Sequence, residues 1–144
     1  VGKRGEACPS GSLFQHPAAT REARPEVLLP CGSRYHGEWL GRQRDGHGLQ
    51  TFENGSFYEG QWRRDSADGV GRLVHANGEV YDGHFRANRA FGRGSYTEIN
   101  GCTYEGQWVE DIQHGHGVEM KPDGVCYEGQ FRSGLKSGKG VFTW

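Results

Sequence analysis

The sequence is poor in the residues that build an ordinary hydrophobic core. Hydrophobic residues make up only 33% of its 144 residues and methionine occurs once, whereas glycine occurs 25 times. That much glycine argues against a helical bundle, and an aromatic content of 12% is too high for a disordered chain. We therefore expect a core of aromatic rings packed over glycine, in a thin ribbon rather than a compact two-layer globule.

The sequence also lacks the signals that are typical of several other classes of protein. The net charge is −1, so no global field attracts nucleic acid or an anionic membrane. No apolar run approaches the roughly 18 residues that span a bilayer, and no charged-then-apolar signal segment opens the chain. The sequence begins at Val1 and stops at Trp144, midway through a repeat, which predicts a processed protein or a piece of a longer one.

What the chain does contain is a repeat. The pattern Tyr-x-Gly-x-Trp/Phe recurs every 23 residues, and a Gly-x-Gly pair follows it at the same interval. Copies at a fixed period predict a stacked array in which no unit buries its apolar face alone. Such an array presents an extended surface rather than an enclosed pocket, so binding is its expected function. The repeat aromatics are Tyr35, Trp39, Tyr58, Trp62, Tyr81, Phe85, Tyr104, Trp108, Tyr127 and Phe131.

One copy, residues 55–77, shows how a repeat is built. Tyr58, Gly60 and Trp62 alternate with polar residues, which predicts a half-buried strand. The central glycine is expected to let a neighbouring side chain lie flat on the backbone. Residues 69–75 form the return strand, so each copy is a β-hairpin.

Two kinds of turn should join these strands. Residues 63–68 turn within a copy, and Asn77-Gly78 leads to the next; Asn-Gly is typical of a type I′ turn. In the first copy Arg42, beside Gly41, stands where later copies have Asp, Asn or Gly, which suggests a looser turn. We predict an all-β, single-layer antiparallel meander of about ten strands, an elongated twisted ribbon of five repeats. The repeats lie at approximately 32–54, 55–77, 78–100, 101–123 and 124–144.

The motif Gly-x-x-Tyr-x-Gly-x-Trp/Phe, followed by Gly-x-Gly, resembles the MORN repeat over residues 30–144. The resemblance implies stacked β-hairpins and a non-enzymatic adaptor that organises assemblies. In this family the repeats also accompany lipid-kinase or methyltransferase domains, and neither is present here. We therefore expect a scaffold that is a structural subunit of a larger assembly, with the repeat region of a longer enzyme as one alternative. Its partners would be other protein subunits or a second copy of itself.

Residues 1–29 lie outside the repeats as an extended N-terminal arm with several prolines and no strand-length alternation. An arm without a core of its own is ordered only when it docks, either on its own repeats or on another subunit. Deletion of residues 1–29 is expected to leave the repeats folded and to weaken association.

The aromatic face is the candidate partner-binding surface. Its rings could simply stack as the core, or part of the stripe could stay open as a groove for a peptide or a partner helix. The apolar strand at residues 140–144 adds an edge that invites pairing. The candidate partner-binding residues are the ten repeat aromatics and Trp144.

Binding to a membrane surface through phospholipid head groups, proposed for the MORN family, is the other alternative. Basic residues gather at the turns within the repeats, but neighbouring acids such as Asp45, Asp65 and Glu110 cancel much of their charge. The result falls short of the about four to eight clustered basic residues typical of lipid recognition. The candidate lipid-binding residues are Arg42, Arg44, Arg63, Arg64, Arg86, Arg89, Arg132 and Lys136.

Other patterns have structural explanations. His114 and His116 share a strand face, but no third ligand stands at a fixed offset, so we predict no metal site. The Gly-x-Gly pairs precede strands rather than helices, which argues against a nucleotide loop. No constellation of Ser, Cys or carboxylate residues stands outside the repeat pattern, so we predict no cofactor and no enzymatic activity. An acidic row is expected to pair across strands with the basic residues inside the Gly-x-Gly pairs. It comprises Glu59, Asp82, Glu105 and Glu128.

The four cysteines, Cys8, Cys31, Cys102 and Cys126, show no Cys-x-x-Cys spacing. Cys102 and Cys126 fall two strands apart, and at ~4.8 Å per strand step they lie beyond disulfide reach. Free thiols suit a reducing compartment. We expect an intracellular location, cytoplasmic or organellar, with a peripheral position at a membrane as the alternative.

Overall fold

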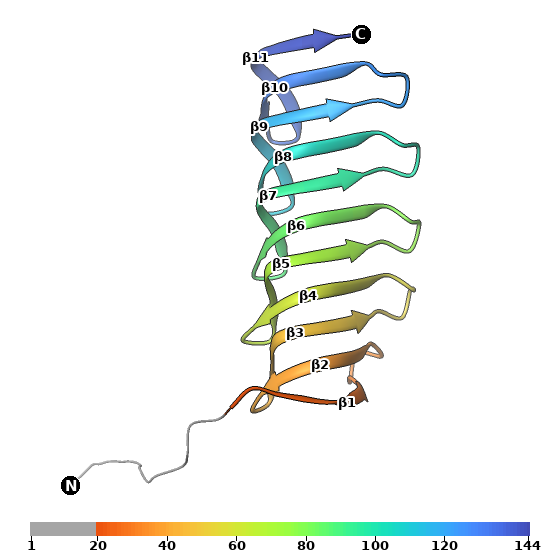
Figure 1. Cartoon of the computed structure of the whole chain (residues 1–144), viewed down its shortest axis with the longest axis vertical. Helices are drawn as coiled ribbons and strands as arrows, with labels where there is room; N and C mark the ends of the chain where they lie inside the picture. Colours follow the sequence, from red (N-terminus) through yellow and green to blue (C-terminus); the bar gives the residue numbers. More distant parts are fainter. Residues whose placement is uncertain (1–19) are drawn as a thin grey trace, which may run out of the picture.

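Residues 20–144 are described by a computed structural model, in which they form one open antiparallel sheet (Figure 1). Every regular element in this described part is a strand, and the strands follow one another in sequence order across the sheet. The predicted all-β, single-layer meander is therefore confirmed. Residues 1–19, which hold most of the expected arm and Cys8, lie outside the described residues.

Eleven strands make up the sheet, one more than the repeats alone supply. Each repeat contributes a strand of seven residues and a return strand of nine. In Figure 1 the loops that join one repeat to the next form a column along one edge of the ribbon. The strands are β1 (Glu22–Leu28), β2 (Arg34–Leu40), β3 (Gln43–Thr51), β4 (Phe57–Arg63), β5 (Ser66–Val74), β6 (Val80–Arg86), β7 (Arg89–Thr97), β8 (Thr103–Val109), β9 (Ile112–Met120), β10 (Cys126–Arg132) and β11 (Leu135–Thr143).

The extra strand is β1, which lies inside the segment that the sequence predicted to have no strand. It pairs antiparallel with β2, with Val27 opposite Tyr35, and its register shifts between Arg24 and Val27. Pro25 lies within this bulge, where a missing backbone N–H removes no ladder bond. The Arg24 guanidinium also lies 5.5 Å from the centroid of the Trp39 ring. This part of the arm thus docks on its own first repeat.

The two glycines of each Gly-x-Gly pair serve different purposes. In the second repeat the register between β4 and β5 shifts between Gly60 and Trp62, and the bulge falls on β5. Gly69, at φ +102°, lies in that bulge, where a left-handed conformation favours glycine. Gly71 lies under the ring of Tyr58, so a Cβ there would overlap the ring.

The central glycine of the Tyr-x-Gly-x-Trp motif is explained only in part by the prediction. Gly60 stands directly opposite Gly71, and a Cβ on Gly60 would overlap the Cα of Gly71. The glycine therefore makes room first for a facing backbone and also for a side chain, because the same Cβ would overlap the Tyr58 hydroxyl. The Tyr58 ring is held over this glycine pair because its Oη donates to the Gln61 carbonyl, 2.8 Å away.

The repeat aromatics form one continuous ladder of edge-to-face rings. Tyr58 meets Trp62 of its own repeat at a centroid distance of 5.2 Å, and it meets Phe85 of the next repeat at 4.9 Å. The same alternation runs through the whole array, so every tyrosine but the last joins two repeats. Such ring pairs contribute about 0.5–1.5 kcal/mol each beyond the area that they bury.

The turn types differ from the prediction. At Asn77-Gly78 only the glycine has positive φ, and Gly78 N donates to the His75 carbonyl at 2.9 Å. The loop is thus a type I turn followed by a left-handed glycine. The Asn77 side chain stabilises this turn because it accepts the Glu79 N–H at 2.9 Å. Type I′ geometry occurs within the repeats instead, for example at Arg64-Asp65, where φ is +49° and +71°.

These inner turns also fasten each repeat to the one before it. Asn88 N donates to the Ala67 carbonyl at 3.0 Å, and its Oδ1 accepts the Ala67 N–H at 2.8 Å. Asp111 forms the same pair of bonds with Ala90. Asp and Asn are among the few residues other than glycine that adopt such positive φ readily, so one residue both turns the chain and clamps it.

Candidate partner-binding groove

Three cavities lie in a row on the face that carries the rings, with volumes of about 280, 290 and 440 Å³. The first and second share Leu73 and Phe85, and the second and third share Tyr96 and Trp108. They therefore form one continuous depression, the ring-face groove. It runs from Arg44 on β3 to Gly134 in the turn before β11.

Six of the predicted binding aromatics form the floor of this groove, whereas Tyr35, Trp39, Tyr127 and Phe131 line none of its cavities. The six are Tyr58, Trp62, Tyr81, Phe85, Tyr104 and Trp108. All the repeat aromatics except Trp39 are buried, with at most 6% of their surface exposed. Burial raises the pKa of Tyr35 to about 12 and raises the pKa of Tyr58 and Tyr81 further, so the ladder stays uncharged at neutral pH. Trp144 lies apart from the groove floor, 87% exposed beyond β11.

The first rung of the ladder differs from the others. Trp39 is half-buried, and its indole Nε1 is buried without a hydrogen-bond partner among residues 20–144. In later repeats the equivalent Nε1 of Trp62 and of Trp108 donates to the carbonyl of Gly48 and of Gly94, at 3.0 Å in each case.

The chemistry that varies along the groove comes from positions that sequence reasoning did not single out. Opposite each ladder tyrosine the return strand presents a residue on the same face of the sheet, and this residue differs in every repeat. A signal was available, because each one follows the Gly-x-Gly pair by two positions. The variable row consists of Gln50, Leu73, Tyr96, Glu119 and Phe142.

At the middle of the groove Tyr96 lies between two other rings. Its plane is within 16° of His75 and within 25° of Trp108, at centroid distances of 6.1 and 6.2 Å. Tyr96 Oη donates to the Glu79 carboxylate, a bond that holds the pKa of Glu79 below its usual range. Burial, and then this bond, raise the pKa of Tyr96 to about 12. Glu79 is therefore charged and Tyr96 neutral at physiological pH.

The two ends of the groove differ in charge. Among the described residues, the one charged side chain that lines the first cavity is Arg44, whose Nε lies 2.7 Å from Asp65 Oδ1. The third cavity is lined by three carboxylates and, in the same part of the chain, by no lysine or arginine. These carboxylates belong to Glu79, Glu98 and Asp111.

The predicted lipid-binding residues do not form a uniform basic edge. Three of them are held in ion pairs, and the Arg86 guanidinium lies 3.6 Å from the centroid of the Phe91 ring. Arg42, Arg63, Arg64 and Arg132 are exposed at the turns. The pairs are Arg44 with Asp65, Arg89 with Glu110 and Lys136 with Glu119, at 2.7, 2.8 and 2.6 Å.

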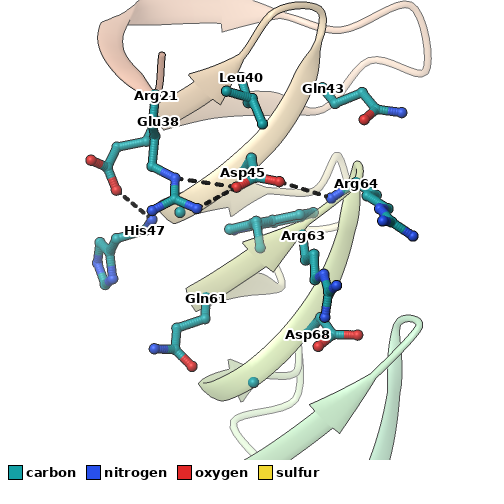
Figure 2. Close-up of a pocket in the computed structure, with 13 residues that line it drawn as sticks. Arg21, Glu38, Leu40, Gln43, Asp45, His47, Gln61, Arg63, Arg64 and Asp68 are labelled. Atoms are coloured by element: carbon teal, nitrogen blue, oxygen red, sulfur yellow. Dashed lines mark hydrogen bonds and ion pairs between the residues drawn. The ribbon is translucent and has the colours of Figure 1, made fainter. Parts of the chain in front are cut away.

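A separate cavity of about 700 Å³ lies where Arg21, just before β1, meets the first two repeats (Figure 2). Arg21 points toward Asp45, with Nη2 2.6 Å from Oδ1, and the Asp45 side chain is only 7% exposed. Asp45 also accepts the Arg64 N–H at 3.2 Å, and the Arg21 hydrogen bond holds its pKa below the usual range. These charges satisfy one another, so we interpret them as a lock that fastens β1.

The acidic row on the opposite face is paired in part as predicted. Glu59 lies 3.6 Å from His47 and Glu128 lies 3.2 Å from His116, both histidines being inside Gly-x-Gly pairs. Asp82 pairs with Arg72 instead, at 4.0 Å, because Arg72 is its direct cross-strand neighbour. The arrangement is ordinary cross-strand chemistry.

The described residues were also compared with the predictions for cysteines, metal ligands and membrane-spanning segments. Cys31, Cys102 and Cys126 are free thiols, as predicted. Within residues 20–144 no three side chains of His, Cys, Asp or Glu are grouped to hold a metal ion. In the same range there is no helix with the length and apolar character needed to cross a membrane.

An open ribbon of β-hairpins with a groove along one face belongs to the class of repeat proteins that present an extended surface. The model of the MORN repeat family matches five consecutive segments, residues 35–57, 58–80, 81–103, 104–126 and 127–144. The chain therefore belongs to the MORN-repeat family. MORN repeats are generally associated with interaction with proteins and membranes. A comparison with curated proteins found no match.

Proposed function

We propose that this chain is a non-catalytic scaffold or adaptor that holds a segment of a partner protein in the ring-face groove. The observation that carries the proposal is the continuity of the groove across the array, from Arg44 to Gly134. Ladder rings form its floor, and three members of the variable row, Gln50, Leu73 and Tyr96, line its cavities. Grooves of this kind bind extended or helical peptide segments through side-chain pockets.

Partner binding is best tested by blocking the centre of the groove. Leu73 is half-buried and lines both the first and the second cavity, so Leu73→Arg places a long charged side chain there. The matched control is Val70→Arg on the same strand, where the wild-type side chain is 51% exposed and lies outside all three groove cavities. Thermal unfolding of both variants establishes that each is folded.

The readout is the native size of the tagged protein in cells of its own source, measured after gentle solubilisation. We expect the wild type and Val70→Arg in a complex of high mass with a fixed set of subunits, and Leu73→Arg outside it. If Leu73→Arg is found in the same complex, the groove is not the surface that binds the partner. A wild-type protein that runs alone at about its own mass of 16.0 kDa would remove the scaffold function itself.

Membrane tethering is the second candidate function, supported by the family association and by the exposed turn arginines. It predicts sedimentation with vesicles that contain phosphatidylserine, falling steeply as salt increases. Arg63→Gln combined with Arg64→Gln should then reduce sedimentation, whereas Leu73→Arg should not. Sedimentation that is absent at low salt would exclude this candidate.

A further inference from the structure

We propose that the groove at the junction of the third and fourth repeats is a site for an arginine side chain supplied by the partner protein. The inference rests on the proposed function, because it names a side chain that the bound segment must present. It comes from comparing this junction with the junction of the first and second repeats, two periods of 23 residues earlier.

At the earlier junction the chain supplies the arginine itself. The Arg44 guanidinium lies 4.5 Å from the centroid of the Trp62 ring, and its Nε donates to Asp65 Oδ1 at 2.7 Å. Its other donors reach the Asp65 carbonyl, at 3.0 Å, and the Gln50 side chain. An aromatic face, a carboxylate and a carbonyl thus hold one planar cation.

Two repeats later the aromatic face and the carboxylate are present without the arginine. Trp108 stands in the place of Trp62 and Asp111 in the place of Asp65, whereas alanine, at Ala90, replaces the arginine. A cavity of about 290 Å³ opens at this junction, and all three of these later residues line it. The other two junctions between repeats have phenylalanine in place of the tryptophan, so they lack the same set.

The charge around the junction favours a cation. The adjoining cavity of about 440 Å³ is lined by Glu79, Glu98 and Asp111, and no lysine or arginine of residues 20–144 lines either cavity. Within that range His75 is the one basic side chain that lines them. At the adjoining turns Arg89 pairs with Glu110 and Lys136 with Glu119. The Arg86 guanidinium lies over the Phe91 ring and Arg132 is exposed, and neither side chain lines these two cavities.

The rings favour arginine over lysine. Trp108, Tyr96 and His75 form an aromatic surface of stacked rings, in which the Tyr96 plane is inclined by 25° to Trp108 and by 16° to His75. A flat guanidinium stacks on such a surface while it forms paired hydrogen bonds with a carboxylate, whereas an ammonium does neither as well. Asp111 keeps acceptor capacity for this purpose, because its one bond from Ala90 N uses only Oδ1.

Two substitutions fill or neutralise the site while keeping the turn. Ala90→Arg gives this junction the arginine that the first junction has, so it occupies the site from within the chain. Asp111→Asn removes the charge and retains the turn, because Asn88 makes the equivalent bond, to Ala67 N, at the same 2.8 Å. Asp65→Asn is the matched control, since it removes the same charge where the site is already filled.

The test uses short peptides selected by phage display on the intact chain, kept only if Leu73→Arg abolishes their binding. We expect the retained peptides to contain arginine. Its replacement by citrulline, which has the same shape without the charge, should weaken binding about ten- to hundredfold, as loss of a charged hydrogen bond does. Ala90→Arg and Asp111→Asn should weaken binding similarly and erase the difference between arginine and citrulline peptides, whereas Asp65→Asn should change neither.

The outcomes distinguish a failure of the arginine site from a failure of the proposed function on which it rests. Retained peptides that bind equally well with citrulline would overturn the arginine site and leave the groove as a binding surface. If Leu73→Arg abolishes the binding of no selected peptide, both the arginine site and the proposed function are wrong. Thermal unfolding of each variant shows whether it is folded, and Asp111→Asn alone decides the question if Ala90→Arg does not fold.

Discussion

Tyr81 of the third repeat stands edge-on to Trp108 of the fourth, with ring centroids 5.3 Å apart and planes 89° apart. Both rings are anchored to backbone carbonyls: Tyr81 Oη donates to His84 at 2.8 Å, and Trp108 Nε1 donates to Gly94 at 3.0 Å. The two repeats are thus joined by rings whose positions the backbone fixes. In a repeat array stability comes from such nearest-neighbour contacts, so these residues are the place to test how the ribbon is held together.

Tyr81→Ala removes a rung of the ladder, and we expect it to lower the free energy of unfolding by about 3–5 kcal/mol, the usual effect of truncating a buried aromatic residue. Tyr81→Phe keeps the ring and loses only the bond to the His84 carbonyl, so the expected loss is about 1 kcal/mol. Urea unfolding followed by tryptophan fluorescence measures both. Equal losses for the two variants would show that the hydroxyl bond within the repeat, and not the ring contact between repeats, accounts for the stability.

Two glycine substitutions should differ because their causes differ. In Gly94→Ala the new Cβ would overlap the ring of Tyr81, and such overpacking costs about 1–3 kcal/mol or more. Gly78 has φ +96° but open space around it, so Gly78→Ala should cost only the roughly 1–2 kcal/mol of a left-handed alanine. Replacing Tyr81 by a smaller residue should relieve Gly94→Ala and leave Gly78→Ala unchanged. A double-mutant cycle without such coupling would refute the overlap.

The clamp at Asn88 combines a backbone conformation, φ +70°, with a side-chain hydrogen bond. Asn88→Gly keeps the conformation and loses the bond to Ala67 N, so we expect a loss of about 1 kcal/mol. Asn88→Ala loses the bond and adds left-handed strain of about 1–2 kcal/mol. Calorimetric unfolding should therefore rank the wild type first, glycine second and alanine last. A glycine variant less stable than the alanine variant would contradict this account.

The lock between Arg21 and Asp45 should make the attachment of β1 depend on pH. The folded-state pKa of Asp45 lies below its usual range because of the Arg21 hydrogen bond. The stabilisation is therefore present above the ordinary Asp pKa of about 3.9, and it is lost as pH falls through the lowered folded-state value. Arg21→Gln should destabilise the protein at pH 7, with a difference from the wild type that shrinks in strong acid. A difference in unfolding midpoint that is the same at both pH values would rule this out.

The period and the motif predicted most of the fold. A strict 23-residue interval with alternating aromatics specifies which residues face inward and how the strands follow one another. The turn types were mistaken, because Asn-Gly is compatible with more than one hairpin loop. In the loop at Asn77-Gly78 the Asn77 side chain accepts the Glu79 N–H, a bond that the dipeptide alone does not reveal.

The strand β1 and the groove lay beyond the sequence argument for physical reasons. β1 has neither the repeat motif nor a clean alternation, and it is a strand because the free edge of β2 offers partners for its backbone. The groove depends on how far the bulged return strands stand clear of the rings. Burial of the candidate residues, such as Tyr58 at 3% exposed, is likewise set by the neighbouring repeats.

The strict strand order of the ribbon also sets the distance between equivalent positions of consecutive repeats along the groove. Each repeat advances the sheet by two strands, about 9.6 Å at ~4.8 Å per strand step. A chain in the polyproline II conformation covers that distance in about three residues, at roughly 3.1 Å each, and its side chains repeat every three residues. A partner lying lengthwise in the groove would therefore be read at every third side chain. On the proposed function, another repeat would therefore lengthen the bound segment by about three residues and leave the spacing between the recognised side chains unchanged.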